Sequence, residues 1–142
     1  MTFPPATTAR LVVDTDVASF VFKWHPDFAP RYLTMIRGAE LVVSFMTLAE
    51  MRQGALDANW GPRKRDVLEA YLADFSVLHS DNLLCSTWAA VRNESAYKGH
   101  NMSSADAWIA ATALVLRAPL VTNNPKDYRH VNALQLLSAT SD

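Results

Sequence analysis

The 142-residue chain lacks the residues that build several common kinds of functional site. Its one cysteine, Cys85, leaves no disulfide within the chain and no cysteine-based zinc motif. The four glycines do not cluster, which excludes a glycine-rich phosphate loop and a dinucleotide-binding fingerprint. The four histidines form no pair at helical metal-binding spacing, and no Gly-x-Ser-x-Gly nucleophile motif occurs. What remains for catalysis is the carboxylate side chains.

The chain also lacks a strong excess of charge and a long apolar run. Thirteen Lys and Arg against 14 Asp and Glu give a net charge of −1, whereas electrostatic nucleic-acid binders are strongly basic. An enzyme that holds phosphates through a metal ion stays compatible with this charge. No segment approaches the roughly 20 apolar residues that span a bilayer, and the first residues do not look like a signal peptide. We therefore expect a cytoplasmic protein with no membrane partner.

What the sequence does contain is a regular alternation of short apolar runs with helical segments. This pattern predicts the α/β class, with a parallel sheet of four to five strands flanked by helices. Residues 1–9, which contain two prolines, are expected to be a flexible leader, and residues 10–142 a single domain. Strands are expected at about 11–13, 41–43, 75–78, 119–122 and 134–137, and helices at about 17–24, 27–37, 47–56, 62–73, 82–97 and 103–117.

Four carboxylates stand where such a sheet would bring them together. Asp14 follows the first strand, Asp127 follows the fourth, and Glu50 and Asp106 lie in first turns of predicted helices. Ligands of open α/β sheets bind at the carboxyl ends of the strands. Carboxylates held together repel each other, and a divalent cation relieves that repulsion. Oxygen ligands suit Mg²⁺ or Mn²⁺, and the reaction class that this implies is phosphodiester hydrolysis.

Each of these acids also has an ordinary structural explanation. Asp14 could cap the helix that follows it, although Asp16 is the better candidate and would leave Asp14 free. Glu50 has capping-box spacing with Thr47, and for Glu50 alone this is the stronger interpretation. Asp106 could interact with the dipole of its own helix, and Asp127 alone is better explained as an ordinary turn or cap residue. The joint occurrence of the acids favours a site more than any one of them does.

Four segments, in order, resemble the motifs of PIN-domain proteins. Residues 11–17 are an apolar strand ending in Asp-Thr-Asp, and residues 44–54 contain the Glu and trailing Gly of the second motif. Residues 104–111 resemble the third motif, an Asp followed by an apolar pair and two alanines. Residues 120–128 resemble the fourth, with Thr-x-Asn, then an acid and an aromatic residue. The resemblance covers about residues 10–137 and implies a PIN-like three-layer fold.

Among PIN domains, a single domain of this length is most similar to the VapC toxins of VapBC toxin–antitoxin pairs. This resemblance implies a homodimeric Mg²⁺-dependent endoribonuclease that cleaves tRNA, rRNA or mRNA, inhibits translation and is neutralised by a VapB-type antitoxin. Carried over by motif, Asp14 and Asp106 are the expected principal metal ligands. Glu50 is the third acidic residue, binding the metal directly or through water, and Asp127 is the fourth, completing the site or orienting water.

The chain departs from the family pattern beside two of these acids. Asp16 stands where Asn is usual, which adds negative charge near the site. Ala105 stands where Asn is frequent, which removes a polar contact beside Asp106. The fourth acidic position varies in the family, and Asp127 is the residue that occupies it here.

Substrate contacts are expected near the acids. Arg52, two residues after Glu50, is the expected phosphate contact, and Thr122 and Asn124 offer neutral oxygens to the substrate or to a water molecule. Trp60, in a polar loop, is expected to be the most exposed of the four tryptophans and a candidate for stacking on RNA or for contact with the antitoxin. Two other tryptophans, at helical spacing, are expected in the core.

Two alternatives remain open from the residues. Asp14 and Asp16 after an apolar strand also suit a phosphatase of the haloacid-dehalogenase type, with Asp14 as covalent nucleophile and Asp16 as acid–base. That class usually continues with Gly-Thr and ends with paired acids, and this chain has neither. The other alternative is a catalytically silent PIN-like module that only binds a partner.

Overall fold

A sheet of five parallel strands, in the order β3-β2-β1-β4-β5, forms the centre of the protein. The structure is a computed structural model that describes residues 9–140. The predicted leader lies outside these residues except for Ala9, whose carbonyl accepts a hydrogen bond from the backbone N–H of Glu40 (2.8 Å). The expectation of a parallel four- to five-stranded sheet is confirmed. The strands are β1 (Arg10–Val13), β2 (Glu40–Ser44), β3 (Ser76–Leu78), β4 (Leu120–Val121) and β5 (Leu136–Leu137).

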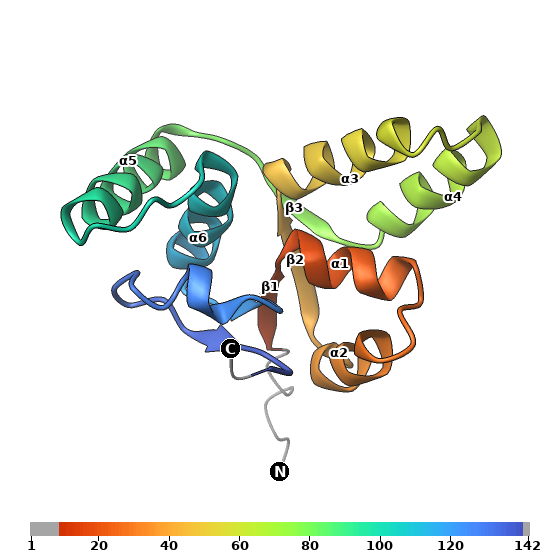
Figure 1. Cartoon of the computed structure of the whole chain (residues 1–142), viewed down its shortest axis with the longest axis horizontal. Helices are drawn as coiled ribbons and strands as arrows, with labels where there is room; N and C mark the ends of the chain where they lie inside the picture. The colour runs from red at the N-terminus through yellow and green to blue at the C-terminus, as the bar shows by residue number, and fades with distance from the viewer. Residues whose placement is uncertain (1–8, 141–142) are drawn as a thin grey trace, which may run out of the picture.

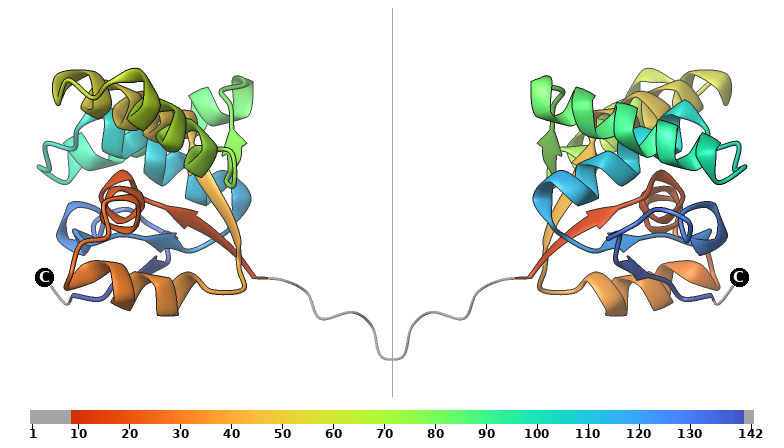
Figure 2. Two further views of the ribbon diagram at one scale, coloured as in Figure 1. Left: turned by 90° about the vertical axis from the view of Figure 1, so that its right-hand side faces the viewer. Right: turned by 90° about the vertical axis from the view of Figure 1, so that its left-hand side faces the viewer.

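Helices cover both faces of this sheet and complete the three predicted layers (Figure 1). On one face, α3 and α4 lie at the opposite end from α2, with α1 between them (Figure 2). On the other face, α5 and α6 pack against each other. The helices are α1 (Thr15–Phe22), α2 (Phe28–Ile36), α3 (Phe45–Asp57), α4 (Pro62–Leu72), α5 (Asn82–Tyr97) and α6 (Ser104–Leu116), with a short 3-10 helix η1 (Pro125–Asp127).

The central strand β1 is apolar on both faces because each face is covered by helices. Leu11 and Val13 pack with residues of α1 to α4, whereas Val12 packs with residues of α6 on the other side. This alternation follows from the period of two along a strand. Val12 and Val13 have no more than 1% of their surface exposed, so β1 is anchored in both cores.

The order of the strands fixes where a site forms. β1 pairs with β2 on one side and with β4 on the other, so chain connections diverge beside its carboxyl end. A crevice at such a topological switch point is the usual ligand site of an open α/β sheet. Asp14 follows β1 at this edge, and Thr122 follows β4 beside it.

Helix α6 runs through the interior, as its nearly apolar sequence predicts. Six of its residues are buried, mostly alanines that let the helix lie close to the sheet. Within residues 9–140, no helix has both the length and the apolar character needed to cross a membrane.

Candidate active site

Asp14 directly follows β1 and is buried, with 6% of the residue's surface exposed. Both oxygens of its carboxylate accept hydrogen bonds. Its Oδ1 accepts the backbone N–H of Thr15 (2.7 Å), and its Oδ2 accepts the hydroxyl of Thr122 (2.7 Å). Asp14 is the N-cap of α1, so the prediction that Asp16 would cap this helix is wrong, and the helix begins at Thr15 rather than at residue 17. The cap geometry fixes the carboxylate at the sheet edge.

The surroundings of Asp14 oppose its negative charge. Burial raises the pKa of Asp14 to about 8, and the neighbouring charges of Asp16 and Asp106 add to this rise. The hydrogen bonds from Thr122 and Thr15 act in the other direction and favour the charged form. The interaction of Asp14 with Asp106 shows that the structure brings these two predicted acids into one site.

Asp16 is a member of the same acidic group. Its Oδ2 accepts the side-chain amide of Asn124 (2.7 Å) and the backbone N–H of Asn123 (3.2 Å), and its Oδ1 accepts the N–H of Val17 (2.7 Å). Burial raises the pKa of Asp16, and the charge of Asp106 adds to that rise. From the sequence, Asp16 was expected as a helix cap, as a departure from Asn and as the acid–base of the phosphatase alternative, but not as a member of the acidic site. Its place two residues after Asp14 was the signal for a further acid in the site.

Asp106 is half-buried in the first turn of α6, where Ser103 caps the helix and accepts the Asp106 N–H (3.1 Å). Burial raises the pKa of Asp106, and the charge of the exposed Asp127 adds to the rise. The hydroxyl of Tyr128 donates to Asp106 Oδ1 (3.2 Å), which opposes that shift. Tyr128 is the aromatic residue of the fourth motif, for which the sequence predicts no role in the site.

Glu50 reaches the group through threonine hydroxyls. The predicted capping box of Thr47 and Glu50 is wrong, because Ser44 is the N-cap of α3 and accepts the N–H of Met46 (3.0 Å). The hydroxyl of Thr15 donates to Glu50 Oε1 (2.8 Å) and lies 2.9 Å from the hydroxyl of Thr47. Glu50 is therefore tied to the residue that follows Asp14.

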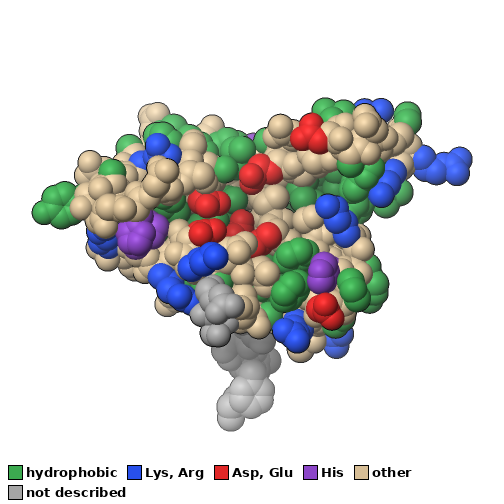
Figure 3. Space-filling view, viewed as in Figure 1, with side chains coloured by type: hydrophobic (Ala, Val, Ile, Leu, Met, Phe, Trp, Pro, Cys, Tyr) green, Lys and Arg blue, Asp and Glu red, His purple; other side chains and the backbone are tan. Residues whose placement is uncertain are grey.

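The acidic side chains gather at the centre of one face, where α1, α3 and α6 meet (Figure 3). None of the ion pairs between residues 9–140 involves Asp14, Asp16 or Asp106. In the same part of the chain, no three acidic, histidine or cysteine side chains form a set that holds a metal ion as they stand. The donor chemistry nevertheless fits Mg²⁺ or Mn²⁺, because Asp106 is close enough to raise the pKa of Asp14 and Asp16, and no ion pair within the described residues neutralises these acids.

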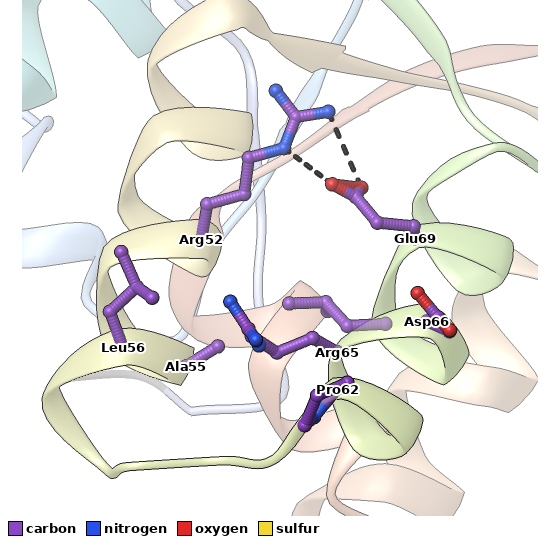
Figure 4. A pocket seen from close by; sticks show the side chains of 8 residues that line it. Arg52, Ala55, Leu56, Pro62, Arg65, Asp66 and Glu69 are labelled. Carbon is purple, nitrogen blue, oxygen red and sulfur yellow. Dashed lines mark hydrogen bonds and ion pairs between the residues drawn. The ribbon is translucent and has the colours of Figure 1, made fainter.

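The three expected substrate contacts have different surroundings. Arg52 reaches from α3 to α4 and pairs with Glu69 (Nε to Oε1, 2.7 Å), beside a pocket of about 410 Å³ between the two helices (Figure 4). Thr122 is fully buried and its hydroxyl donates to Asp14, so it positions this carboxylate. Asn124 is exposed, and its amide donates to Asp16.

The tryptophans correct two expectations. Trp24 is 65% exposed, whereas Trp60 is half-buried with its ring against Phe22 and the ammonium of Lys64 3.9 Å from its centre, so Trp60 is not the most exposed. The two tryptophans expected in the core are only half-buried. They stack on each other between α5 and α6 with ring centres 4.9 Å apart, and the one in α5 packs against the edge of the core. They are Trp88 and Trp108.

Comparisons with known proteins agree with this architecture. Ribonuclease VapC1 of Haemophilus influenzae is 28% identical over 125 residues, which cover 87% of this chain and 93% of the relative. The tRNA(fMet)-specific endonuclease VapC of Shigella flexneri is 25% identical over 126 residues, 89% of this chain and 95% of the relative. The crystal structure of VapBC-1 from nontypeable Haemophilus influenzae superposes with a TM-score of 0.77 at 27% identity, covering 91% of this chain and 97% of that one.

The match to a family model extends over all four acidic motifs. The model described as "PIN domain" matches residues 11–134, which include Asp14, Glu50, Asp106 and Asp127. The fold, the position of the acids at the sheet edge and this match agree with one another, and the chain belongs to the PIN domain family.

Proposed function

We propose that the protein is a metal-dependent endoribonuclease of the VapC kind. The observation that carries the proposal is the group of Asp14, Asp16 and Asp106 at the edge of the sheet, with no Lys or Arg paired to them within residues 9–140. The charge of Asp106 raises the pKa of both Asp14 and Asp16. A buried concentration of negative charge favours binding of a divalent cation. The family and the names of the relatives support RNA as the substrate.

In this proposal the acids have separate tasks. Asp14 and Asp106 bind Mg²⁺ or Mn²⁺, Glu50 binds it directly or through water, and Asp127 completes the site or orients water. The cation, when bound, polarises a phosphoryl oxygen and favours ionisation of a water molecule. Thr122 holds Asp14 in place, and Thr15 holds Glu50 beside it.

Partners follow from the same family relationship. We propose that the chain forms a homodimer and is neutralised by a VapB-type antitoxin, since the Haemophilus structure that it resembles is a VapBC protein. Cleavage of tRNA, rRNA or mRNA would inhibit translation in the cytoplasm. Transfer RNA is the first substrate to test, because the Shigella relative is called a tRNA(fMet)-specific endonuclease.

The test is cleavage of RNA by the purified protein. We expect internal cuts with Mg²⁺ and none with EDTA, read by sequencing the RNA ends. Asp14→Asn and Asp106→Asn should each lower the rate by about 100-fold or more, because each removes a charged ligand of the cation. Asp74→Asn, which changes an exposed acid just after α4, should cleave like the wild type.

The outcomes separate the competing functions. RNA cleavage that is insensitive to both active-site substitutions would contradict the proposal. No cleavage of any RNA class, together with tight binding of a VapB-type protein, would support the silent module. The PIN family match argues against the phosphatase, and a covalent aspartyl-phosphate on Asp14 would be needed to reinstate it.

A further inference from the structure

We propose that Tyr128 is a positioning residue whose hydroxyl holds the carboxylate of Asp106 in the orientation that binds the divalent cation. This inference rests on the proposed function and goes beyond the four acids. It starts from one contact, the hydrogen bond from Tyr128 Oη to Asp106 Oδ1 (3.2 Å). The two residues come from different elements, since Tyr128 follows η1 and Asp106 lies in α6.

The ring of Tyr128 is held in place by contacts other than the one with Asp106. The residue is 1% exposed and packs in the core between α6 and the sheet, together with Ala107 and Leu120. Its backbone N–H donates to the carbonyl of Pro125 (3.0 Å), which places it at the end of the η1 turn. A ring held by the core and a backbone held by a turn leave the hydroxyl little freedom.

The hydroxyl is unnecessary for filling this space. A phenylalanine ring would bury the same carbon atoms, whereas a buried hydroxyl is costly unless it makes a hydrogen bond. Here the hydrogen-bond acceptor is Asp106, an acid of the site, rather than a backbone carbonyl. This distinguishes Tyr128 from Tyr71, whose hydroxyl donates to the carbonyl of Ala18 (2.8 Å).

Tyr128 also remains a neutral donor beside the acids. Burial raises its pKa far above the ordinary value, and the charges of Asp14 and Asp106 raise it further. The hydroxyl therefore keeps its proton and adds no negative charge to the group.

The neighbouring sequence gives this contact particular weight. Ala105 stands directly before Asp106, and its methyl group cannot donate a hydrogen bond. Tyr128 supplies a donor from another part of the chain. Partners that orient a metal ligand in this way are typically worth about 10- to 100-fold in metal affinity.

The test compares Tyr128→Phe with Tyr71→Phe. Mn²⁺ binding to the metal-free protein is measured by electron paramagnetic resonance, and RNA cleavage is measured against Mg²⁺ concentration. In Tyr128→Phe, we expect Mn²⁺ to bind about 10-fold more weakly. The Mg²⁺ concentration for half-maximal cleavage should rise by a similar factor, with kcat near the wild-type value at saturating Mg²⁺. Tyr71→Phe, which also loses a hydroxyl that donates one hydrogen bond, should leave both unchanged.

The results distinguish positioning from stability. Thermal unfolding shows that both variants are folded, and similar changes in Tm are expected because each loses one part-buried side-chain hydrogen bond. Unchanged Mn²⁺ affinity in Tyr128→Phe, or equal weakening in both variants, would overturn the inference while leaving the nuclease function intact. A wild-type protein that neither binds Mn²⁺ nor cleaves RNA would overturn both.

Discussion

Asp14 combines two roles in one carboxylate. It caps α1 through the Thr15 N–H and also belongs to the acidic site, where Asp16 and Asp106 raise its pKa. The cap and the Thr122 hydrogen bond keep the side chain in place even though burial opposes its charge. Asp14 is held rigidly, and its raised pKa reflects burial and repulsion from the neighbouring carboxylates. Such an acid is well suited to bind a cation, since binding relieves that repulsion without moving the side chain.

The raised pKa of Asp14 predicts an unusual effect of pH on stability. Its value of about 8 lies above the ordinary 3.8, so just below pH 8 the native state binds a proton that the unfolded state has released. The free energy of unfolding of the metal-free protein should therefore rise as the pH is lowered from 9 to 7. Denaturant unfolding across this range measures the effect. Asp14→Asn should flatten the dependence, and Asp74→Asn should keep it.

Two results would contradict this prediction. One is a stability that falls steadily from pH 9 to pH 7, and the other is an equal slope in the wild type and in Asp14→Asn. Added Mg²⁺ gives an independent check. It should stabilise the wild type most at pH 9, where Asp14 is ionised, because a ligand that binds only the native state raises the free energy of unfolding.

At the scale of elements, three helices begin at the site. The N-cap residues are Asp14 for α1, Ser44 for α3 and Ser103 for α6. The side chain of each accepts a hydrogen bond from a backbone N–H of its helix. The positive ends of their dipoles favour negative charge. This arrangement offsets part of the repulsion between the acids and explains how the fold tolerates them although no Lys or Arg within residues 9–140 forms an ion pair with them.

The cap of α3 gives a direct prediction. Ser44→Ala removes the hydroxyl that accepts the Met46 N–H, and we expect it to lower the free energy of unfolding by about 1 kcal/mol. Ser86→Ala, at an exposed position within α5, is the matched control and should change stability little. Chemical denaturation of both variants measures the difference. Equal stabilities of the two variants would show that Ser44 does not cap the helix.

The sequence predicted the strands well because each is a short apolar run covered on both faces, as β1 shows. It also found Asp14 and Asp106, whose positions after a strand and at a helix start are visible locally. It assigned the capping box to Thr47 because local spacing cannot reveal that Thr47 contacts Thr15, 32 residues away. For the same reason it gave no role to Tyr128, whose partner lies 22 residues away.

At the scale of the whole molecule, the segment after η1 joins the active site to α5. Tyr128 contacts Asp106, and two residues later His130 docks on α5, where its Nε2 lies 2.8 Å from the hydroxyl of Ser95. The ring of His130 stacks on that of His100 with centres 4.1 Å apart. The docking of this segment therefore stabilises the part of the chain that carries Tyr128.

This docking should weaken in acid. Burial lowers the pKa of His130 below its ordinary 6.5, the nearby His100 and Lys98 lower it further, and Glu94 opposes them. Its buried Nδ1 has no hydrogen-bond partner in the described part of the chain, so a proton added there would have no acceptor among these residues. In the unfolded chain His130 binds a proton near pH 6.5, whereas in the native state it binds one only at lower pH. The free energy of unfolding therefore falls as the pH falls below 6.5.

The contribution of His130 can be isolated by comparing unfolding of the wild type and His130→Gln between pH 7.5 and pH 5. Asp14 contributes equally to both proteins, so the difference between their curves reports His130 alone. We expect His130→Gln to be less stable than the wild type at pH 7.5, because it loses the packed ring. The difference in the free energy of unfolding between the two proteins should become smaller as the pH falls. His79→Gln, at an exposed histidine, should run parallel to the wild type throughout. A difference in the free energy of unfolding that stays constant with pH would show that His130 is protonated in the native state as readily as in the unfolded state. The docking of His130 on α5 would then not be sensitive to acid.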